Sequence, residues 1–407
     1  MRSRDQAEAA APAPGARKRL AIITTVWKYL SHAQHMGDRF LVGYPIEGTW
    51  RKPPIDVVSL YVDQKPEDDQ SEERARSFGF KVYPTIAEAL RCGGDKLAVD
   101  AVLIIGEHGD YPRNEKGQIL YPRFEFFRQA VDVFEAEGRA VPIFNDKHLS
   151  YSFEKAKTMV ELSRKLGFPL LAGSSLPVTW RLPAVDLPLG AVVEDALMVG
   201  VGGSDAMDYH ALEAMQCVLE RRKGGETGVK RVQMIEGDAV WRAADEGRWS
   251  RKLLEAALSR SDSLQGLTVE DGRTQNLAVG DEIKRIVKKP AAYFIEYADG
   301  TKATLLMLNG ALNDYNLAVK VKDRPDILST QFMLPTPPNV AYSANLMNYA
   351  SRMFETGRAA YPADRTMLVC GILESCLDSR MNDQTPLDTP HLAVRYEPLK
   401  ESLFARR

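Results

Sequence analysis

Histidines gather at the ends of apolar segments in the first 150 residues of this chain. Three of the six histidines fall at such ends: His108, His148 and either His32 or His35. If the segments are parallel strands of one sheet, their carboxyl ends share one edge, where open α/β sheets bind ligands. We therefore predict that this edge carries the functional site.

The loop 107–110 reads Glu-His-Gly-Asp and follows one of these apolar segments. A polar loop with a glycine beside a buried strand is typical of a binding site. Glu107 and His108 are therefore candidate ligands of a cofactor or substrate. His32 and His35, three apart on one helix face, could bind a metal, or they cap the helix or face solvent. The main expectation is no metal, with His35 and His108 as the alternative ligands.

Lys147 stands between Asp146 and His148 at the end of another apolar segment. A lysine that leaves a buried strand can transfer a proton or hold an alkoxide by its charge. The alternative is a structural ion pair between Lys147 and Asp146.

A second polar cluster occupies the segment 199–216, where two glycines precede Asp205, Asp208, His210 and Glu213. His210 and Glu213 lie one helical turn apart on the same face. A carboxylate beside a histidine fixes its tautomer, so the pair can shuttle a proton. Alternatively, an aspartate caps the helix and His210 packs in the core.

The segments that position these residues alternate between two patterns up to about residue 150. The pattern predicts strands at 20–25, 55–63, 81–84, 98–109 and 140–146, and helices at 32–43, 71–78, 86–92 and 124–137. These strands are apolar and β-branched without alternation, as in parallel sheets covered on both faces. We predict a Rossmann-like, doubly wound α/β domain.

The second half of the chain has a different pattern. A helix at 152–167 is followed by a strand that leads out of the first domain. Segments with alternating apolar and polar residues then follow at 230–237, 276–287, 291–310 and 315–322. Asp-Gly at 299–300 lies between two alternating runs and predicts a hairpin. We predict an α+β domain with a large, mostly antiparallel sheet, helices on one face, and a last helix near 363–380 that packs back on the first domain. The expected boundaries are 1–18 for a disordered leader, 19–150 for the first domain and 151–407 for the second.

Composition restricts the partners and the compartment. The formal net charge of -2 over 407 residues argues against nucleic acid or an anionic membrane as the main partner. The four cysteines have no C-x-x-C spacing, which predicts buried, reduced thiols. The leader lacks the apolar core of a signal peptide, and no stretch reaches the roughly 18–20 apolar residues of a membrane span. We predict a cytoplasmic protein.

The turn after the first strand departs from the usual dinucleotide-binding pattern. It carries Thr24, Thr25 and Trp27 where that pattern has G-x-G-x-x-G, whose glycines let a helix N-terminus approach a pyrophosphate. Asp63 ends the second strand, where an acidic residue can hold a ribose hydroxyl and favour NAD over NADP. Alternatively, Asp63 only forms a turn.

These motifs resemble the glucose-fructose oxidoreductase / inositol dehydrogenase / MocA (Gfo/Idh/MocA) family of sugar-type oxidoreductases, over nearly the whole chain after the leader. Asp146-Lys147-His148 stands where the family has Glu-Lys-Pro, and Arg181 ends the segment that follows. His210 and Glu213 match the histidine and second acid of the family's Asp-x-Gly-x-His-x-x-Asp motif. The tail 354–380 resembles the family's closing segment. The glycine fingerprint and the usual polar segment after the fourth strand are replaced.

The resemblance implies hydride transfer between NAD or NADP and a hydroxyl of a sugar or cyclitol. It implies acid–base roles for Lys147, His210 and Glu213, and substrate contacts from Asp146, His148 and Arg181. The cofactor side would consist of Thr24, Thr25, Asp63, Glu107 and His108. The family also implies a homo-oligomer, a dimer or tetramer formed through the open face of the second sheet.

Two other readings stay open. In the first, a lyase, hydrolase or isomerase acts on a sugar derivative with the same acid–base pair, without a nucleotide and with or without a metal. In the second, the chain is a non-catalytic ligand-binding protein on the same fold. Nucleotide titration separates the dehydrogenase from both.

Overall fold

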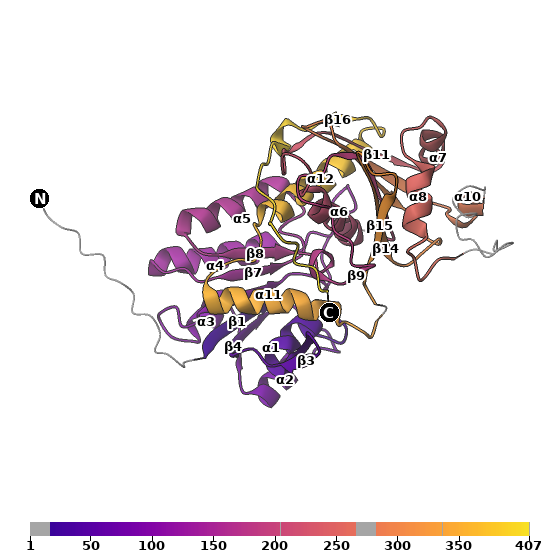
Figure 1. The fold of residues 1–407 in the computed structure, drawn as a ribbon. Helices are drawn as coiled ribbons and strands as arrows, with labels where there is room; N and C mark the ends of the chain where they lie inside the picture. The colour runs from indigo at the N-terminus through magenta and orange to yellow at the C-terminus, as the bar shows by residue number, and fades with distance from the viewer. Residues whose placement is uncertain (1–16, 204, 266–281, 336, 407) are drawn as a thin grey trace, which may run out of the picture.

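The computed structural model describes residues 17–203, 205–265, 282–335 and 337–406. Its first sheet has six parallel strands in the order β5-β4-β1-β6-β7-β8 (Figure 1). The strands are β1 (Lys18–Thr24), β4 (Ile55–Val62), β5 (Lys81–Tyr83), β6 (Ala101–Ile105), β7 (Ile143–Asp146) and β8 (Leu170–Gly173). This is the doubly wound order, which reverses between β1 and β6. The predicted Rossmann-like sheet is confirmed.

Alternate residues of the buried strands face opposite layers of helices. Ile23 and Ile104 pack in one core cluster with the first layer, whereas Ile22 and Leu103 pack in another with the second. The first layer is α3 (Ile86–Arg91), α4 (Arg123–Glu137) and α5 (Phe153–Leu166). The second is η1 (Ala33–Gly37), α1 (Asp38–Val42), α2 (Ser71–Phe78) and α11 (Tyr342–Thr356). Both faces are covered, which explains the continuous apolar sequence of the strands.

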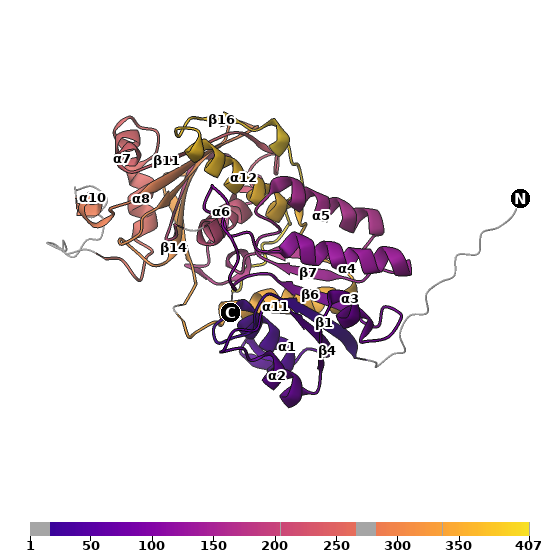
Figure 2. The same cartoon turned by 180° about the vertical axis from the view of Figure 1, so that it is seen from behind.

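The first sheet extends beyond the expected boundary at residue 150, because β8 pairs with β7 as its sixth strand. A helix from the second half of the chain, α11, packs with Leu346 and Met353 on the layer of Phe40. The predicted last helix is α12 (Asp364–Met381), which lies between α5 and the second sheet (Figure 2). The Thr366 hydroxyl of α12 donates to the Ala172 carbonyl of β8, so this helix also contacts the first sheet. Lys18 belongs to β1 rather than to the leader, whose residues 1–16 lie outside the described residues.

The second sheet has eight strands in the order β16-β11-β12-β13-β10-β14-β15-β9. Its strands are β9 (Arg181–Leu182), β10 (Val193–Gly200), β11 (Val229–Glu236), β12 (Ala291–Tyr297), β13 (Lys302–Met307), β14 (Tyr315–Val321), β15 (Ile327–Phe332) and β16 (Leu387–Asp388). Among the described strands of this sheet, β10 and β13 alone pair in parallel, so the predicted, mostly antiparallel sheet is confirmed. The Asp-Gly turn joins β12 to β13 as a hairpin. The minor elements are β2 (Tyr44–Ile46), β3 (Thr49–Arg51), η2 (Leu176–Val178) and η3 (Pro390–Leu392).

Helices cover both faces of the second sheet, so the expectation of one open face was wrong. Met198 of β10 packs toward α6 (Asp205–Leu219) and α12, whereas its neighbours Leu197 and Val199 pack toward the opposite layer. That layer consists of α7 (Asp238–Asp245), α8 (Arg251–Leu258) and α10 (Glu282–Ile286). The segment 276–287, expected to be a strand, contains α10, and its first residues lie outside the described residues. Apolar residues on both sides of β10 require cover on both sides.

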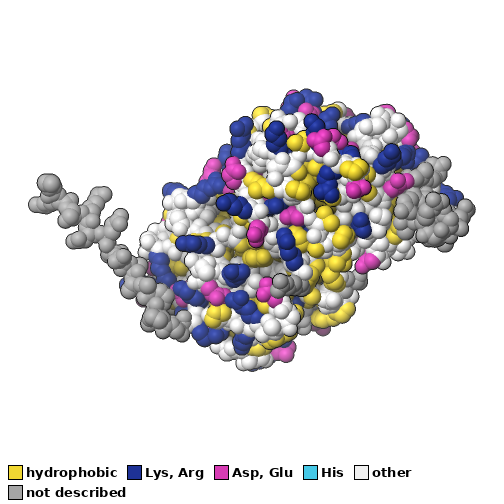
Figure 3. All heavy atoms as spheres, viewed as in Figure 1, with side chains coloured by type: hydrophobic (Ala, Val, Ile, Leu, Met, Phe, Trp, Pro, Cys, Tyr) yellow, Lys and Arg dark blue, Asp and Glu magenta, His cyan; other side chains and the backbone are white. Residues whose placement is uncertain are grey.

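The thiols of the protein are reduced and mostly buried. All four cysteines are free, and Cys217, Cys370 and Cys376 are buried. Among the residues that the structure describes, no helix combines the length and apolar character of a membrane span. On the face drawn in Figure 3, basic and acidic side chains are interspersed.

Candidate active site

A buried ion pair joins two strand ends of the first sheet. Lys147 follows β7 and Glu107 follows β6, and Lys147 Nζ lies 2.6 Å from Glu107 Oε1. Arg123, at the start of α4, donates to Glu107 Oε2 at 2.8 Å. Burial opposes ionisation of Glu107, but the charges of Lys147, His32 and Arg123 outweigh it and hold the Glu107 pKa well below its usual range. Lys147 thus pairs with Glu107, not with Asp146.

Asp146 is fully buried at the end of β7, and its carboxylate faces His32. Asp146 Oδ2 lies 2.6 Å from His32 Nδ1, and Oδ1 accepts the backbone N–H of Lys147 at 2.8 Å. This contact orients the His32 ring and directs its Nε2 toward Glu107 Oε1, 4.0 Å away. We assign Asp146 the task of positioning His32 rather than the predicted contact with substrate.

Two further histidines lie against His32. The His32 ring is 4.8 Å from the His35 ring and 4.9 Å from the His108 ring, between centroids. Burial lowers the pKa of His108 to about 4, with a further contribution from His32. Burial also lowers the pKa of His35 well below its usual value, again with a contribution from His32. Both imidazoles are therefore neutral at neutral pH.

His148 connects this cluster to the start of α6. Its Nε2 lies 3.5 Å from Asp205 Oδ2, and both side chains are buried. Asp205 also lines a polar cavity of about 250 Å³ together with Asp208, Asn309, Lys289 and Arg380. Asp205 thus contacts His148 and also lines the cavity.

His210 is oriented by a serine and not by the expected carboxylate. Its Nδ1 lies 2.5 Å from Oγ of Ser174, the residue after β8. Glu213 accepts the backbone N–H of Ser174 at 2.5 Å and the Thr366 hydroxyl at 2.8 Å, which joins β8, α6 and α12. Burial raises the Glu213 pKa to about 7, whereas burial and the charge of Lys147 lower the His210 pKa well below its usual value. The structure gives Glu213 a structural position and leaves His210 near Lys147.

The hydroxyls expected to bind a cofactor instead join β1 to β6 at the point where the strand order reverses. Thr25 Oγ1 donates to the Glu107 carbonyl at 2.7 Å, and Thr24 Oγ1 donates to the Ile105 carbonyl at 3.0 Å. Each hydroxyl hydrogen is thus used within the protein. Neither threonine offers it to a ligand.

Two loops meet over the end of β1. Gln64 and Asp110 exchange hydrogen bonds of 2.9 Å in both directions, between the side-chain amide of Gln64 and the backbone of Asp110. Asp63 accepts the hydroxyls of Tyr61 and Tyr111, each at 2.7 Å. These contacts bridge the crevice where a dinucleotide lies in doubly wound folds.

The loop after β1 is filled by a side chain. Trp27 is fully buried and stacks on Phe80, and a Cβ added at Gly37 would lie 2.7 Å from the Trp27 ring. Two of the loop's backbone N–H groups are used within the protein: Lys28 N donates to Ser31 Oγ, and Leu30 N to Gln34 Oε1. A loop filled by a tryptophan ring, with these N–H groups already bonded, does not fit a dinucleotide bound in the usual way.

Arg181 was predicted to bind substrate, and the structure places it elsewhere. It is buried, its NH1 lies 2.9 Å from Asp186 Oδ1, and its guanidinium stacks between the rings of Phe332 and Phe404. Stacked and paired inside the second domain, Arg181 has a structural role.

Sequence reasoning missed Arg123, Ser174 and Tyr342. Ser174 follows β8, so the strand-end rule could have found it once β8 was assigned to the first sheet. Arg123 and Tyr342 begin helices α4 and α11, and no local pattern marks them. The Tyr342 ring lies 5.9 Å from the His35 ring, so the helix from the second half of the chain completes the site.

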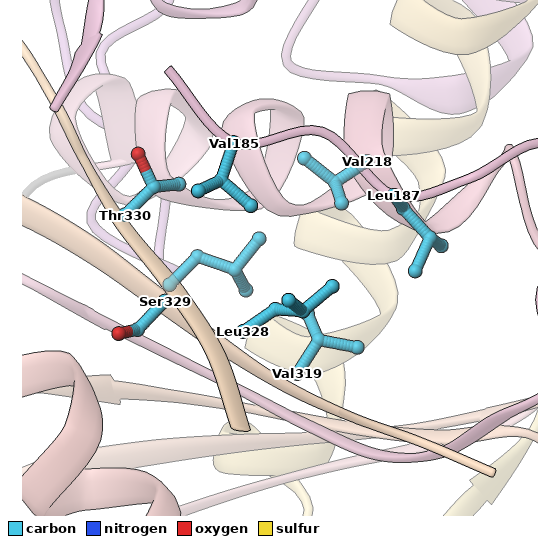
Figure 4. Close-up of a pocket in the computed structure, with 8 residues that line it drawn as sticks. Val185, Leu187, Val218, Val319, Leu328, Ser329 and Thr330 are labelled. Carbon is cyan, nitrogen blue, oxygen red and sulfur yellow. The ribbon is translucent and has the colours of Figure 1, made fainter. Parts of the chain in front are cut away.

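A small apolar pocket lies between α6 and the strands β14 and β15 (Figure 4). Its lining includes Val185, Leu187, Val218, Val319 and Leu328, with the hydroxyls of Ser329 and Thr330 at its edge. It holds no imidazole, carboxylate or amine for acid–base chemistry. We therefore place the candidate site at the edge of the first sheet.

Known structures with a similar architecture include two myo-inositol dehydrogenases and GenD2. GenD2 from gentamicin A biosynthesis, in complex with NAD, has 13% identity, a TM-score of 0.56, and a match covering 94% of this chain and 99% of that chain. The myo-inositol dehydrogenase of Lactobacillus casei, in complex with NAD(H) and myo-inositol, has 13% identity, a TM-score of 0.53, and coverage of 91% and 96%. The chain has the fold of these dehydrogenases. At this identity the likeness establishes the fold alone.

The myo-inositol 2-dehydrogenase of Lactobacillus plantarum matches similarly, with 13% identity, a TM-score of 0.52, and coverage of 91% of this chain and 99% of that chain. No protein-family model and no curated protein matches the sequence. The architecture thus agrees with the fold that the resemblance implies, at 13% sequence identity to these structures.

Proposed function

We propose that this chain is an enzyme that transfers protons on a sugar- or cyclitol-like substrate, as a lyase or isomerase, without a bound nucleotide. The observation that carries the proposal is the buried Lys147–Glu107 pair, whose lysine charge acts on His210, at a sheet edge whose dinucleotide crevice is bridged by protein. Perturbed, buried ionisable groups that converge on one place are typical of active sites.

His210 is the base in this proposal, because its lowered pKa keeps the imidazole neutral at neutral pH. Ser174 holds Nδ1, so Nε2 would accept a proton from a carbon next to a substrate carbonyl. The C–H electrons then move toward the carbonyl oxygen, and the Lys147 ammonium stabilises the negative charge that forms there. Where the α-carbon carries a hydroxyl, transfer of its proton to the carbonyl oxygen and return of the carbon-derived proton from His210 to the former carbonyl carbon would give isomerisation. Departure of a β-hydroxyl, protonated to water by the His210 imidazolium, would give elimination.

The polar cavity beside Asp205 supports a hydroxylated substrate. Its lining combines the carboxylates of Asp205 and Asp208, the amide of Asn309, and the cationic Lys289 and Arg380. Donors and acceptors of this kind recognise hydroxyl groups.

The second candidate is the NAD(P)-dependent oxidoreductase that the family resemblance implies. The shared fold with NAD complexes of sugar and cyclitol dehydrogenases favours it. In that case Lys147 and His210 would accept the proton of the substrate hydroxyl. In the loop after β1, Tyr29 is exposed and Lys28 is partly exposed, and a nucleotide would have to contact them from outside.

Hydrogen exchange separates these candidates. The full-length protein is incubated in D₂O with a panel of keto-sugars and keto-cyclitols, without nucleotide, and proton NMR follows the C–H beside the carbonyl. We expect signal loss for at least one substrate, and a roughly 100-fold slower rate in Lys147→Met. Lys155→Met is the control, because Lys155 is a partly exposed lysine paired with Glu125.

Nucleotide binding is measured in parallel by intrinsic fluorescence and thermal shift with NADH and NADPH. Saturable micromolar binding, with exchange only when nucleotide is present, would support the second candidate and refute the first. Without exchange or nucleotide binding, the non-catalytic reading would stand.

A further inference from the structure

We infer that His32, Glu107 and His108 form a binding site for one divalent first-row transition metal ion. Each residue offers a ligand atom, and the three atoms lie within 4.8 Å of one another. His32 comes from the segment after β1, and Glu107 and His108 from the loop after β6. A single ion at their centre would join the two strands that flank the reversal of strand order.

His32 is already held as a metal ligand usually is. Metal-bound histidines commonly donate their second ring N–H to a carboxylate, which fixes the tautomer. Here that carboxylate is Asp146, with Oδ2 at 2.6 Å from His32 Nδ1. The other nitrogen, Nε2, is left to face Glu107 Oε1 at 4.0 Å.

Two imidazole nitrogens in this cluster lack a hydrogen-bond partner among the described residues. They are His108 Nε2 and His35 Nδ1, both buried atoms. His35 is only 6% exposed, and the centroid of its ring lies 4.8 Å from the centroid of the His32 ring. Buried polar atoms are nearly always satisfied, so an unpartnered pair in a histidine cluster indicates a bound ion or water. A metal at His108 Nε2 would satisfy that nitrogen.

The surrounding charges determine whether a cation can enter. Lys147 and Arg123 both contact Glu107 and oppose a cation, whereas Asp146 and Glu107 favour it. Each carboxylate oxygen has two lone pairs, so Glu107 can keep Lys147 and still bind an ion. The two carboxylates balance the lysine and arginine charges.

The donor set defines the class of metal. Two imidazoles and one carboxylate, without a thiolate, suit zinc and also ferrous or manganous ions with open coordination positions. An ion here would lie beside Lys147 and could polarise a substrate oxygen. This inference goes beyond the proposed function and does not require it, because binding is measured without turnover.

The test uses full-length protein stripped with a chelator. Zinc chloride is titrated by calorimetry near neutral pH, and cobalt is followed by its visible absorption. We expect one saturable zinc site per chain and cobalt bands typical of nitrogen and oxygen ligands. His108→Ala should abolish both, and Asp146→Asn should weaken zinc roughly 10- to 100-fold, the usual effect of a lost supporting carboxylate.

His391→Ala is the matched control, because His391 contacts Ser375 on α12 and the Phe153 ring, outside this cluster. His108→Gln provides a second variant if His108→Ala fails to fold, as judged by circular dichroism. Stronger binding of manganese or iron than of zinc, with the same loss in His108→Ala, also supports the site. Absence of binding, or equal binding in the His108→Ala and His391→Ala proteins, overturns it.

Discussion

The Lys147 ammonium and the Glu107 carboxylate, from the ends of adjacent strands, meet 2.6 Å apart in a buried setting. Arg123 shares the same carboxylate, so one acidic group satisfies two buried cations. Removal of one partner from a buried ion pair leaves an uncompensated charge, which makes Glu107 the critical member of the group.

Glu107→Gln should therefore destabilise the protein strongly. Lys147 and Arg123 would remain buried without a counter-charge, and the expected loss in the free energy of unfolding is about 3–5 kcal/mol. Urea denaturation followed by tryptophan fluorescence measures it. Glu125→Gln removes a half-exposed partner of Lys155 and should cost at most about 1 kcal/mol. Similar midpoints for the two variants would contradict the assignment.

Glu213→Gln should alter the pH dependence of stability. The folded-state pKa of Glu213 is about 7, above its ordinary value of 4.5, because the carboxyl is buried. The native state then binds more protons than the unfolded state between these values, so the wild type loses stability as pH rises through that window, by about 3 kcal/mol. Glutamine cannot ionise, and its oxygen can accept from Ser174 N while its amide donates to Thr366.

Urea denaturation at several pH values between about pH 5 and pH 8 tests the direction of this stability change. The free energy of unfolding of the variant should increase relative to that of the wild type as pH rises. The variant should also keep its activity if Glu213 is structural. Exposed Glu154→Gln is the control and should follow the wild type throughout. Parallel curves for wild type and Glu213→Gln would show that the carboxyl is not held neutral.

Ser174→Ala should slow proton transfer by loosening His210. The hydroxyl is the partner of His210 Nδ1 and also accepts the Leu176 N–H at 3.0 Å, so its loss frees the ring. We expect roughly 10-fold slower exchange in D₂O, and recovery in Ser174→Thr, which keeps the hydroxyl. The wild-type rate should fall with acid only below the usual histidine value, since burial lowers the His210 pKa. An acid limb near the ordinary value, unchanged in Ser174→Ala, would exclude His210 as the base.

Trp27→Ala tests whether the loop after β1 is part of the core. Trp27 is fully buried against Phe80 and Gly37, so the cavity should cost about 3–5 kcal/mol in the free energy of unfolding. Trp50 is 63% exposed, and Trp50→Ala should change stability by at most about 0.5 kcal/mol. A Trp27→Ala protein as stable as the Trp50→Ala protein would indicate a loop that opens easily to a ligand.

The local sequence pattern predicted the helices and strands and located several candidate functional residues. Continuous apolar, β-branched segments specified parallel strands, and the Asp-Gly turn specified the β12–β13 hairpin. Strand ends then placed Glu107, Lys147 and His148 on one edge of the sheet, because parallel strands bring their carboxyl ends together. These inferences need only periodicity and neighbouring residues, which the linear chain contains.

The partners of those residues were decided by tertiary structure. Lys147 meets Glu107 rather than the adjacent Asp146, which meets His32 from the segment after β1. The sequence of β10 has two apolar faces, but it does not show how many helices cover the second sheet. No local signal in the sequence shows that Gln64 and Asp110 meet over β1. Such contacts join side chains 40 to 114 positions apart, and their geometry depends on strand order and packing. Sequence periodicity thus determined which residues reach the edge, and three-dimensional packing determined which of them pair, because pairing depends on distances that a linear pattern does not contain.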